Sequence, residues 1–321
     1  MPLAVNEIYL GDARELLSEL EPTSIACAIW SPPYHVGKEY EKDISYEEWV
    51  EMLEEVIQLH YPIIKSGGFL AINIADILCF ADPNMPRIQA QNLRRQRSDV
   101  TREDVLAAKQ AHPQYNRYQL ANFLGCSEQT IDRRLNGNNI RGGKYATQTR
   151  VRLAGGIIED AATKAGLYLY DRRVWLKDAA WENSKWHTLS YRSVDEFEYL
   201  YIFWKPGETI VDRDKLSAEE WVAWGSRGVW NIPSVRANDD HEAKFPLELP
   251  RRAIKLLSAP GDTILDCFMG SGTTALAAIQ EGRDYIGIEK ISQYVELARQ
   301  ACKNELEKLR NPLATQLSFV S

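Results

Sequence analysis

Short apolar runs alternate with amphipathic stretches in the first part of the chain. "IACAIW" (25–30) lies between two prolines, which predicts a buried strand. "SYEEWVEMLEEVIQLHYPIIKSGG" (45–68) repeats apolar residues at helical spacing and starts with a serine–glutamate capping box, so we predict a helix that stops at Gly67 or Gly68. "FLAINIA" (69–75) follows as a second buried strand. Strand, helix and strand in short succession predict a parallel sheet.

The pattern breaks near residue 80 and resumes near 151, without internal repeats or low-complexity tracts. The fold class that it predicts is α/β, a doubly wound, mostly parallel sheet with a helical insertion. The expected segments are 1–80, 81–150 and 151–321. In the last segment, helices are expected at 152–166, 245–259, 273–282 and 292–309, and strands at 168–176, 196–204, 262–268 and 284–289.

Composition narrows the protein class. The 321 residues are 45% hydrophobic, as in an ordinary globular protein, and no apolar run approaches the roughly 18 residues that span a bilayer. The five cysteines are scattered and have no C-x-x-C spacing, which argues against a disulfide framework or a zinc site. We therefore expect a cytoplasmic protein with no membrane association and no metal site.

Charge is distributed unevenly along the chain. The net charge is −7, yet residues 86–150 hold 12 Lys and Arg against 5 Asp and Glu. A basic segment inside an acidic body favours local contact with phosphates, because DNA attraction depends on local charge neutralisation. An ordinary solvated charged face is the alternative.

A glycine-rich turn stands where a predicted strand ends and a helix begins. In "DCFMGSGTT" (266–274), Gly270 and Gly272 allow a tight turn and close approach of the backbone to a ligand. Asp266 ends this strand and Glu289 ends the next one. A carboxylate at such a position can accept two ribose hydroxyls, so the pattern favours a nucleoside ligand over a purely structural turn.

"SPPY" (31–34) after an early strand, followed late in the chain by "DCFMGSGTT", resembles the beta group of amino DNA methyltransferases. The resemblance covers residues 5–80 and about 167–305. It implies a Rossmann-like methyltransferase fold with permuted motif order, S-adenosylmethionine (SAM) as cofactor and double-stranded DNA as substrate. It also implies that the target base is rotated out of the duplex.

The resemblance assigns catalytic roles to the four residues of this motif. The Ser31 hydroxyl and the Pro32 carbonyl would accept the protons of an exocyclic amine, which frees the nitrogen lone pair to attack the sulfonium methyl. Pro32 and Pro33 restrict the loop so that both acceptors point the same way. Tyr34 would stack on the extruded base.

Further residues are expected to bind the cofactor. By resemblance, Asp12 would meet the SAM adenine, although with Glu15 it also fits a helix capping box. Phe245 and Pro246 would flank the methionine end, although they also fit a helix entry with a packed aromatic ring. The glycine turn and the next strand end contribute Asp266, Phe268, Gly270, Ser271, Gly272, Thr273 and Glu289.

The target is expected to be an amino group, because no cysteine follows a proline as cytosine C5 chemistry would require. In this group of enzymes a serine at the first motif position usually accompanies N4-cytosine methylation, and N6-adenine is the alternative. A cognate restriction endonuclease acting on the same site is an expected partner, and the protein would be a monomer or homodimer. A DNA-binding regulator that keeps a degenerate SAM fold is the alternative from another class.

"YQLANFLGCSEQTIDRRLNGNN" (118–139) in the insertion predicts a helix-turn-helix. The turn is expected at Gly125, and Ser127 would cap the second helix. Residues facing outward from this helix would contact DNA, unless the insert only stabilises the fold. The expected DNA-binding residues are Arg94, Arg95 and Arg97 upstream, and Gln129, Thr130, Arg133 and Arg134.

Overall fold

A computed structural model describes most of the chain, namely residues 3–33, 45–75, 77–81, 84, 99–136, 149–178, 196–210, 212–235 and 245–311. The chain divides into two compact units. We call the first, residues 1–80, 151–179 and 196–321, the sheet unit. The second, residues 81–150 and 180–195, is the helical unit. In the described part of the chain no helix is long and apolar enough to cross a membrane.

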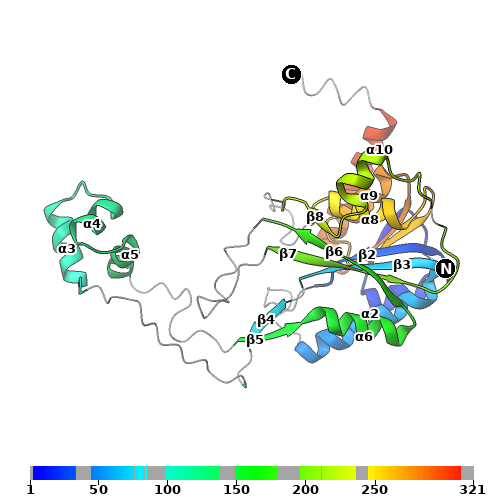
Figure 1. Cartoon of the computed structure of the whole chain (residues 1–321), viewed down its shortest axis with the longest axis horizontal. Helices are drawn as coiled ribbons and strands as arrows, with labels where there is room; N and C mark the ends of the chain where they lie inside the picture. Colours follow the sequence, from blue (N-terminus) through cyan, green and yellow to red (C-terminus); the bar gives the residue numbers. More distant parts are fainter. Residues whose placement is uncertain are drawn as a thin grey trace. The chain divides into compact units, whose positions relative to one another are not determined.

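The sheet unit is built on eight strands in the order β1-β10-β9-β2-β3-β7-β6-β8 (Figure 1). From β1 to β3 all neighbours are parallel, whereas β7 runs antiparallel to both β3 and β6. The predicted mostly parallel α/β sheet is therefore confirmed. The bounds are β1 (Glu7–Leu10), β10 (Asp284–Glu289), β9 (Thr263–Asp266), β2 (Ile25–Trp30), β3 (Ile64–Ile74), β7 (Phe197–Trp204), β6 (Tyr168–Leu176) and β8 (Val229–Asn231); a separate two-stranded sheet pairs β4 (Ile77–Ala81) with β5 (Thr149–Leu153).

Helices cover both faces of the sheet (Figure 1). Side chains alternate along β2, so that Ala28 and Trp30 join one apolar core and Cys27 and Ile29 join the other. One layer holds α1 (Ala13–Leu16), the 3-10 turn η1 (Leu17–Glu19), α2 (Tyr46–Ile63) and α6 (Ala154–Ala165). The other holds α8 (Glu248–Leu257), α9 (Thr273–Gln280), α10 (Ser292–Arg310) and the π-helix η4 (Trp221–Gly225) after α7 (Ala218–Glu220).

Helix α2 begins as predicted but ends earlier. Ser45 and Glu48 form the reciprocal capping box. The expected stop at Gly67 or Gly68 is wrong, because the helix ends at Ile63 and β3 follows at once. Gly67 instead has φ 79° inside the strand, where any side chain would clash with the Glu208 carbonyl. This glycine therefore serves a close approach between two backbone segments.

The sheet reverses its winding direction between β9 and β2. From β9 the chain passes through α9 to β10 on one side, and from β2 it passes through α2 to β3 on the other. Open α/β sheets bind their ligands at the carboxyl ends of strands at such a switch point. The "SPPY" loop follows β2 and the glycine turn follows β9, so both motifs start at this point.

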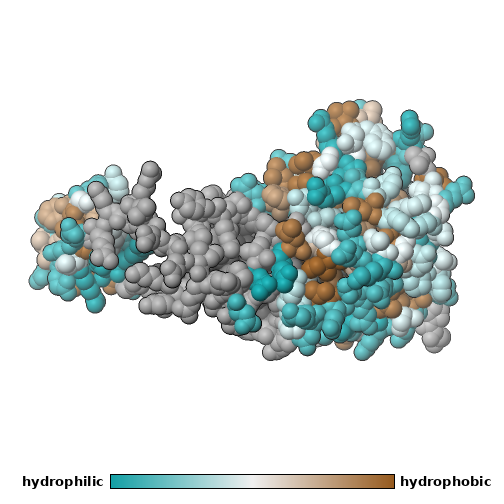
Figure 2. Space-filling model, turned by 60° about the horizontal axis from the view of Figure 1, so that its bottom comes forward, coloured by the Kyte–Doolittle hydropathy of each residue, from teal (hydrophilic) through white to brown (hydrophobic). Residues whose placement is uncertain are grey.

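The helical unit contains three helices in its described residues, α3 (Arg102–Ala111), α4 (Arg117–Phe123) and α5 (Glu128–Asn136). Gly125 has φ 63° in the turn between α4 and α5, where we predicted the turn. Five small or apolar residues form the buried core: Val105, Ala108, Leu120, Ala121 and Ile131. Figure 2 shows apolar (brown) side chains on the surface of this unit as well.

Candidate active site

The glycine turn links the end of β9 to the first turn of α9. Gly272 has φ 94° and caps α9. A Cβ at Gly272 would lie 2.9 Å from the Cβ of Ala298 in α10. Only glycine meets both conditions without strain, so one reason for it is the packing of α10 against the turn.

Asp266 organises the glycine turn from inside. Its side chain is buried, and its two carboxylate oxygens accept from the Phe268 amide at 2.9 Å and from the Thr274 hydroxyl at 2.6 Å. Burial raises the pKa of Asp266 to about 7, the nearby Glu289 charge adds to the rise, and the two hydrogen bonds oppose it. A cationic group placed here would restore the charged form.

Glu289 connects the ends of three strands. One carboxylate oxygen accepts from the Gly270 amide at 2.8 Å, and the other accepts from the Ile291 amide at 2.8 Å. Its backbone carbonyl accepts from the Gly11 amide at 3.0 Å, directly after β1. Each carboxylate oxygen keeps a further lone pair, so the group can still accept from ribose hydroxyls.

Asp12 lies next to this connection but is engaged locally. It caps α1 by accepting from the Arg14 amide at 3.0 Å, and Arg14 pairs with both of its carboxylate oxygens, also at 3.0 Å. The hydrogen bonds from the Arg14 side chain lower the pKa of Asp12 to about 2. The cap thus uses Arg14 and not Glu15, and contact with an adenine remains a prediction.

The "SPPY" loop leaves the sheet beside the glycine turn. Cys27 and Ala28 of β2 pair with Ile264 and Leu265 of β9. Two residues past this pairing, the Trp30 indole meets the Phe268 ring edge-on, with centroids 5.4 Å apart. The structure thus brings the start of one motif against the other.

Within the motif, Ser31 and Pro33 are half-buried and Pro32 is buried. The Pro33 carbonyl accepts from the Trp49 indole at 2.7 Å, so this carbonyl is committed to the fold. Tyr34 lies outside the described residues.

Sequence reasoning missed the groups that hold this loop. The Trp30 indole donates to Nε2 of His60 at 3.1 Å, and Nδ1 of His60 lies 2.7 Å from the Val56 carbonyl. Trp49 and His60 lie eleven residues apart on the buried side of α2. A histidine on an otherwise apolar helix stripe was the signal that could have revealed this network.

Phe245 and Pro246 precede α8. The Pro246 carbonyl accepts from the Leu249 amide at 3.0 Å, and Phe245 packs partly buried against the core. Because α8 leads into β9, its N-terminus lies toward the carboxyl ends of the parallel strands. The pair thus stands at the expected edge of the sheet, and its contact with the methionine end of SAM remains a prediction.

The predicted DNA-binding residues of α5 fall into two groups. Gln129 and Arg133 are exposed and, four residues apart, lie on the same side of the helix. Thr130 is half-buried, with its hydroxyl 3.0 Å from that of the capping residue Ser127. Arg134 donates to the Val100 carbonyl at 2.9 Å. Only the first pair is left fully available to a partner.

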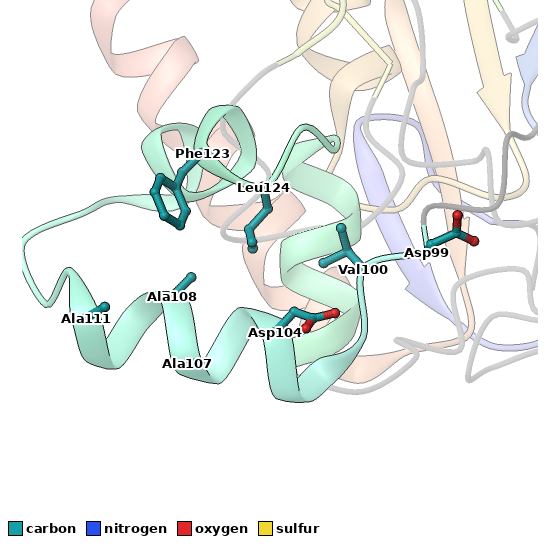
Figure 3. Close-up of a pocket in the computed structure, with 8 residues that line it drawn as sticks. All are labelled: Asp99, Val100, Asp104, Ala107, Ala108, Ala111, Phe123 and Leu124. Carbon is teal, nitrogen blue, oxygen red and sulfur yellow. The ribbon is translucent and has the colours of Figure 1, made fainter.

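The upstream basic residues Arg94, Arg95 and Arg97 lie outside the described part of the chain. A shallow hollow elsewhere on the helical unit is lined by apolar side chains, with Asp99 and Asp104 beside them (Figure 3). These two carboxylates disfavour phosphate, so the hollow does not suit the DNA backbone.

Comparison with known proteins identifies the family. The pattern of the N6/N4 DNA methylases, described as "DNA methylase", matches residues 25–300. The chain belongs to this family. It is 64% identical to the type II methyltransferase M.BglI of Bacillus subtilis over 92% of this chain and 85% of that protein. The predicted membership in the beta-group amino DNA methyltransferases is thereby confirmed.

Two solved structures share the fold. The DNA modification methylase TTHA0409 of Thermus thermophilus, complexed with SAM, matches with a TM-score of 0.61 and 24% identity over 93% of each chain. The cytosine-N4-specific PvuII DNA methyltransferase matches with a TM-score of 0.55 and 18% identity over 97% of this chain and 94% of that one. The expected cofactor, SAM, agrees with the family and with the first of these structures.

Proposed function

We propose that this DNA methyltransferase transfers the methyl group of SAM to the exocyclic N4 of a cytosine rotated out of duplex DNA, as part of a restriction–modification system. One observation carries the proposal: the pairing of β2 with β9 puts Ser31 directly beside the glycine turn. A serine at this motif position favours cytosine over adenine. The relationship to type II methyltransferases supports the setting and an endonuclease partner.

The charges at the sheet edge fit this cofactor. Asp266 and Glu289 place two carboxyl groups around the turn, which favours a cation and disfavours a pyrophosphate. SAM supplies an electrophilic methyl group on a positively charged sulfur. Glu289 would hold the ribose hydroxyls and Asp266 would face the cationic part of the ligand, while the free backbone of the glycine turn admits close approach.

The motif loop would activate the amine. The lone pair of an exocyclic amine is conjugated with the base ring, and acceptors on both amine protons pull the nitrogen toward tetrahedral geometry. Because the Pro33 carbonyl is bound by Trp49, the acceptors that remain in the described motif are the Ser31 hydroxyl and the Pro32 carbonyl. The fixed φ of two prolines preorganises them.

The helical unit is proposed to recognise the DNA target through α5. The exposed pair Gln129 and Arg133 offers an amide and a guanidinium, the two groups that read adenine and guanine edges most readily. The boundaries 81–150 and the helix-turn-helix role are parts of this proposal.

Analysis of modified nucleosides tests the proposal directly. Duplex DNA is incubated with the protein and SAM, digested to nucleosides and analysed by mass spectrometry. We expect N4-methylcytosine. N6-methyladenine would instead support the alternative within the family, and no methylated base would support a regulator that has lost catalysis.

A further inference from the structure

Helix α2 holds the catalytic loop at two points, one on each side of Ser31. Upstream, His60 accepts from the Trp30 indole at 3.1 Å; downstream, Trp49 donates to the Pro33 carbonyl at 2.7 Å. We propose that Trp49 and His60 are positioning residues, which set the direction of the Ser31 hydroxyl and the Pro32 carbonyl for methyl transfer. The inference rests on the proposed function, since it assigns the loop a catalytic task.

The upstream contact fixes the state of His60. An indole N–H can only donate, so Nε2 of His60 must accept, and Nδ1 must carry the hydrogen that is donated to the Val56 carbonyl at 2.7 Å. Burial lowers the pKa of His60 to about 4, which keeps the ring neutral. The chain Trp30–His60–Val56 therefore ties the last residue of β2 to the backbone of α2 with defined donors and acceptors.

The downstream contact uses the same face of the helix. Eleven residues separate Trp49 from His60, which is three turns with a residual rotation of only about 20° and a rise of about 16 Å. Both side chains are buried. Only three residue steps separate Trp30 from Pro33, so the segment between the two contacts has little freedom to reorient.

Packing alone does not explain these residues. Apolar side chains would fill the same buried positions without desolvating a ring nitrogen or an indole N–H. What the polar groups add is direction, because each hydrogen bond is satisfied by one atom of the loop or strand. This matters for a loop whose function depends on where two oxygen atoms point.

The substitution Trp49→Phe removes the N–H and keeps an aromatic ring. The rate of a single turnover, with enzyme, SAM and duplex DNA preassembled, is expected to fall by roughly 10- to 100-fold, while the Kd for SAM changes less than about twofold. Trp221→Phe is the matched control: Trp221 also donates to a backbone carbonyl, that of Arg213 at 3.0 Å, within the segment around η4. Its single-turnover rate should equal that of the wild type.

A second pair of variants separates direction from packing. His60→Gln keeps an acceptor for the Trp30 indole and should retain more activity than His60→Leu, which leaves that donor buried and unpaired. The proposal is overturned by a Trp49→Phe rate within twofold of the wild type. Equal rates for the two His60 variants, or loss of SAM binding in parallel with the rate, would overturn it too. An inactive wild type would instead refute the proposed function.

Discussion

The affinity for SAM should depend on pH through Asp266. Its carboxyl group is buried at the turn, and its pKa rises from the ordinary 3.8 to about 7, chiefly because burial disfavours the charged form. If the ionised carboxylate binds the cationic ligand, about one molecule in eleven is competent at pH 6 and about ten in eleven at pH 8, so the Kd should be about tenfold higher at pH 6.

Titration calorimetry at pH 6, 7 and 8 would measure this change. Asp266→Asn is the control: it has nearly the same shape and stays neutral, so its weaker binding should not follow the same pH dependence. Equal wild-type Kd values at pH 6 and pH 8 would refute the reasoning, and a tenfold change retained in Asp266→Asn would assign it to another group.

The same pKa shift predicts how Asp266 affects folding. Between about pH 4 and pH 7 the folded protein without ligand holds a proton at Asp266 that the unfolded chain has already released. The contribution of this group to stability therefore falls as the pH rises across that range. Asp266→Asn removes the buried charge, so at pH 8 it should raise the thermal midpoint of the free protein while weakening SAM binding.

Two further predictions concern the turn and the helical unit. Gly272→Ala should lower the free energy of unfolding by about 2–4 kcal/mol in urea denaturation, because φ is 94° and the new Cβ meets α10. Gly156→Ala, at a helical site where a Cβ meets nothing, should instead stabilise by about 0.5–1 kcal/mol; a similar loss in both would contradict the account. Arg133→Ala should weaken DNA binding and reduce the slope of log K against log salt by about one, whereas Arg134→Ala should mainly destabilise the helical unit, because Arg134 binds the Val100 carbonyl. An unchanged salt slope for Arg133→Ala would exclude its phosphate contact.

The central strands of the sheet were predictable from sequence. β2, β9 and β10 are short apolar runs followed by helices, and burial on both faces is what makes such runs continuous. The edge strands β1 and β8 were not predicted, because they are short and partly exposed and so lack that signal. Helix α3 was also missed, since it buries only Val105 and Ala108.

The candidate site was predictable as a set of residues and less so as a set of interactions. The motifs indicated which side chains gather at the sheet edge. That Asp12 is engaged by Arg14, and that Pro33 is held by Trp49, depends on partners which no motif specifies. The end of α2 was misplaced for a similar reason: Gly67 is required by a contact with Glu208, far away in sequence.

Methyl transfer by a Ser31→Ala variant tests most directly whether the rigid bend after β2 activates the amine. With labelled SAM and duplex DNA under single-turnover conditions, the wild type should form N4-methylcytosine, and the variant should bind SAM normally but transfer methyl groups on the order of 100-fold more slowly. A variant that methylates DNA at the wild-type rate would contradict the account.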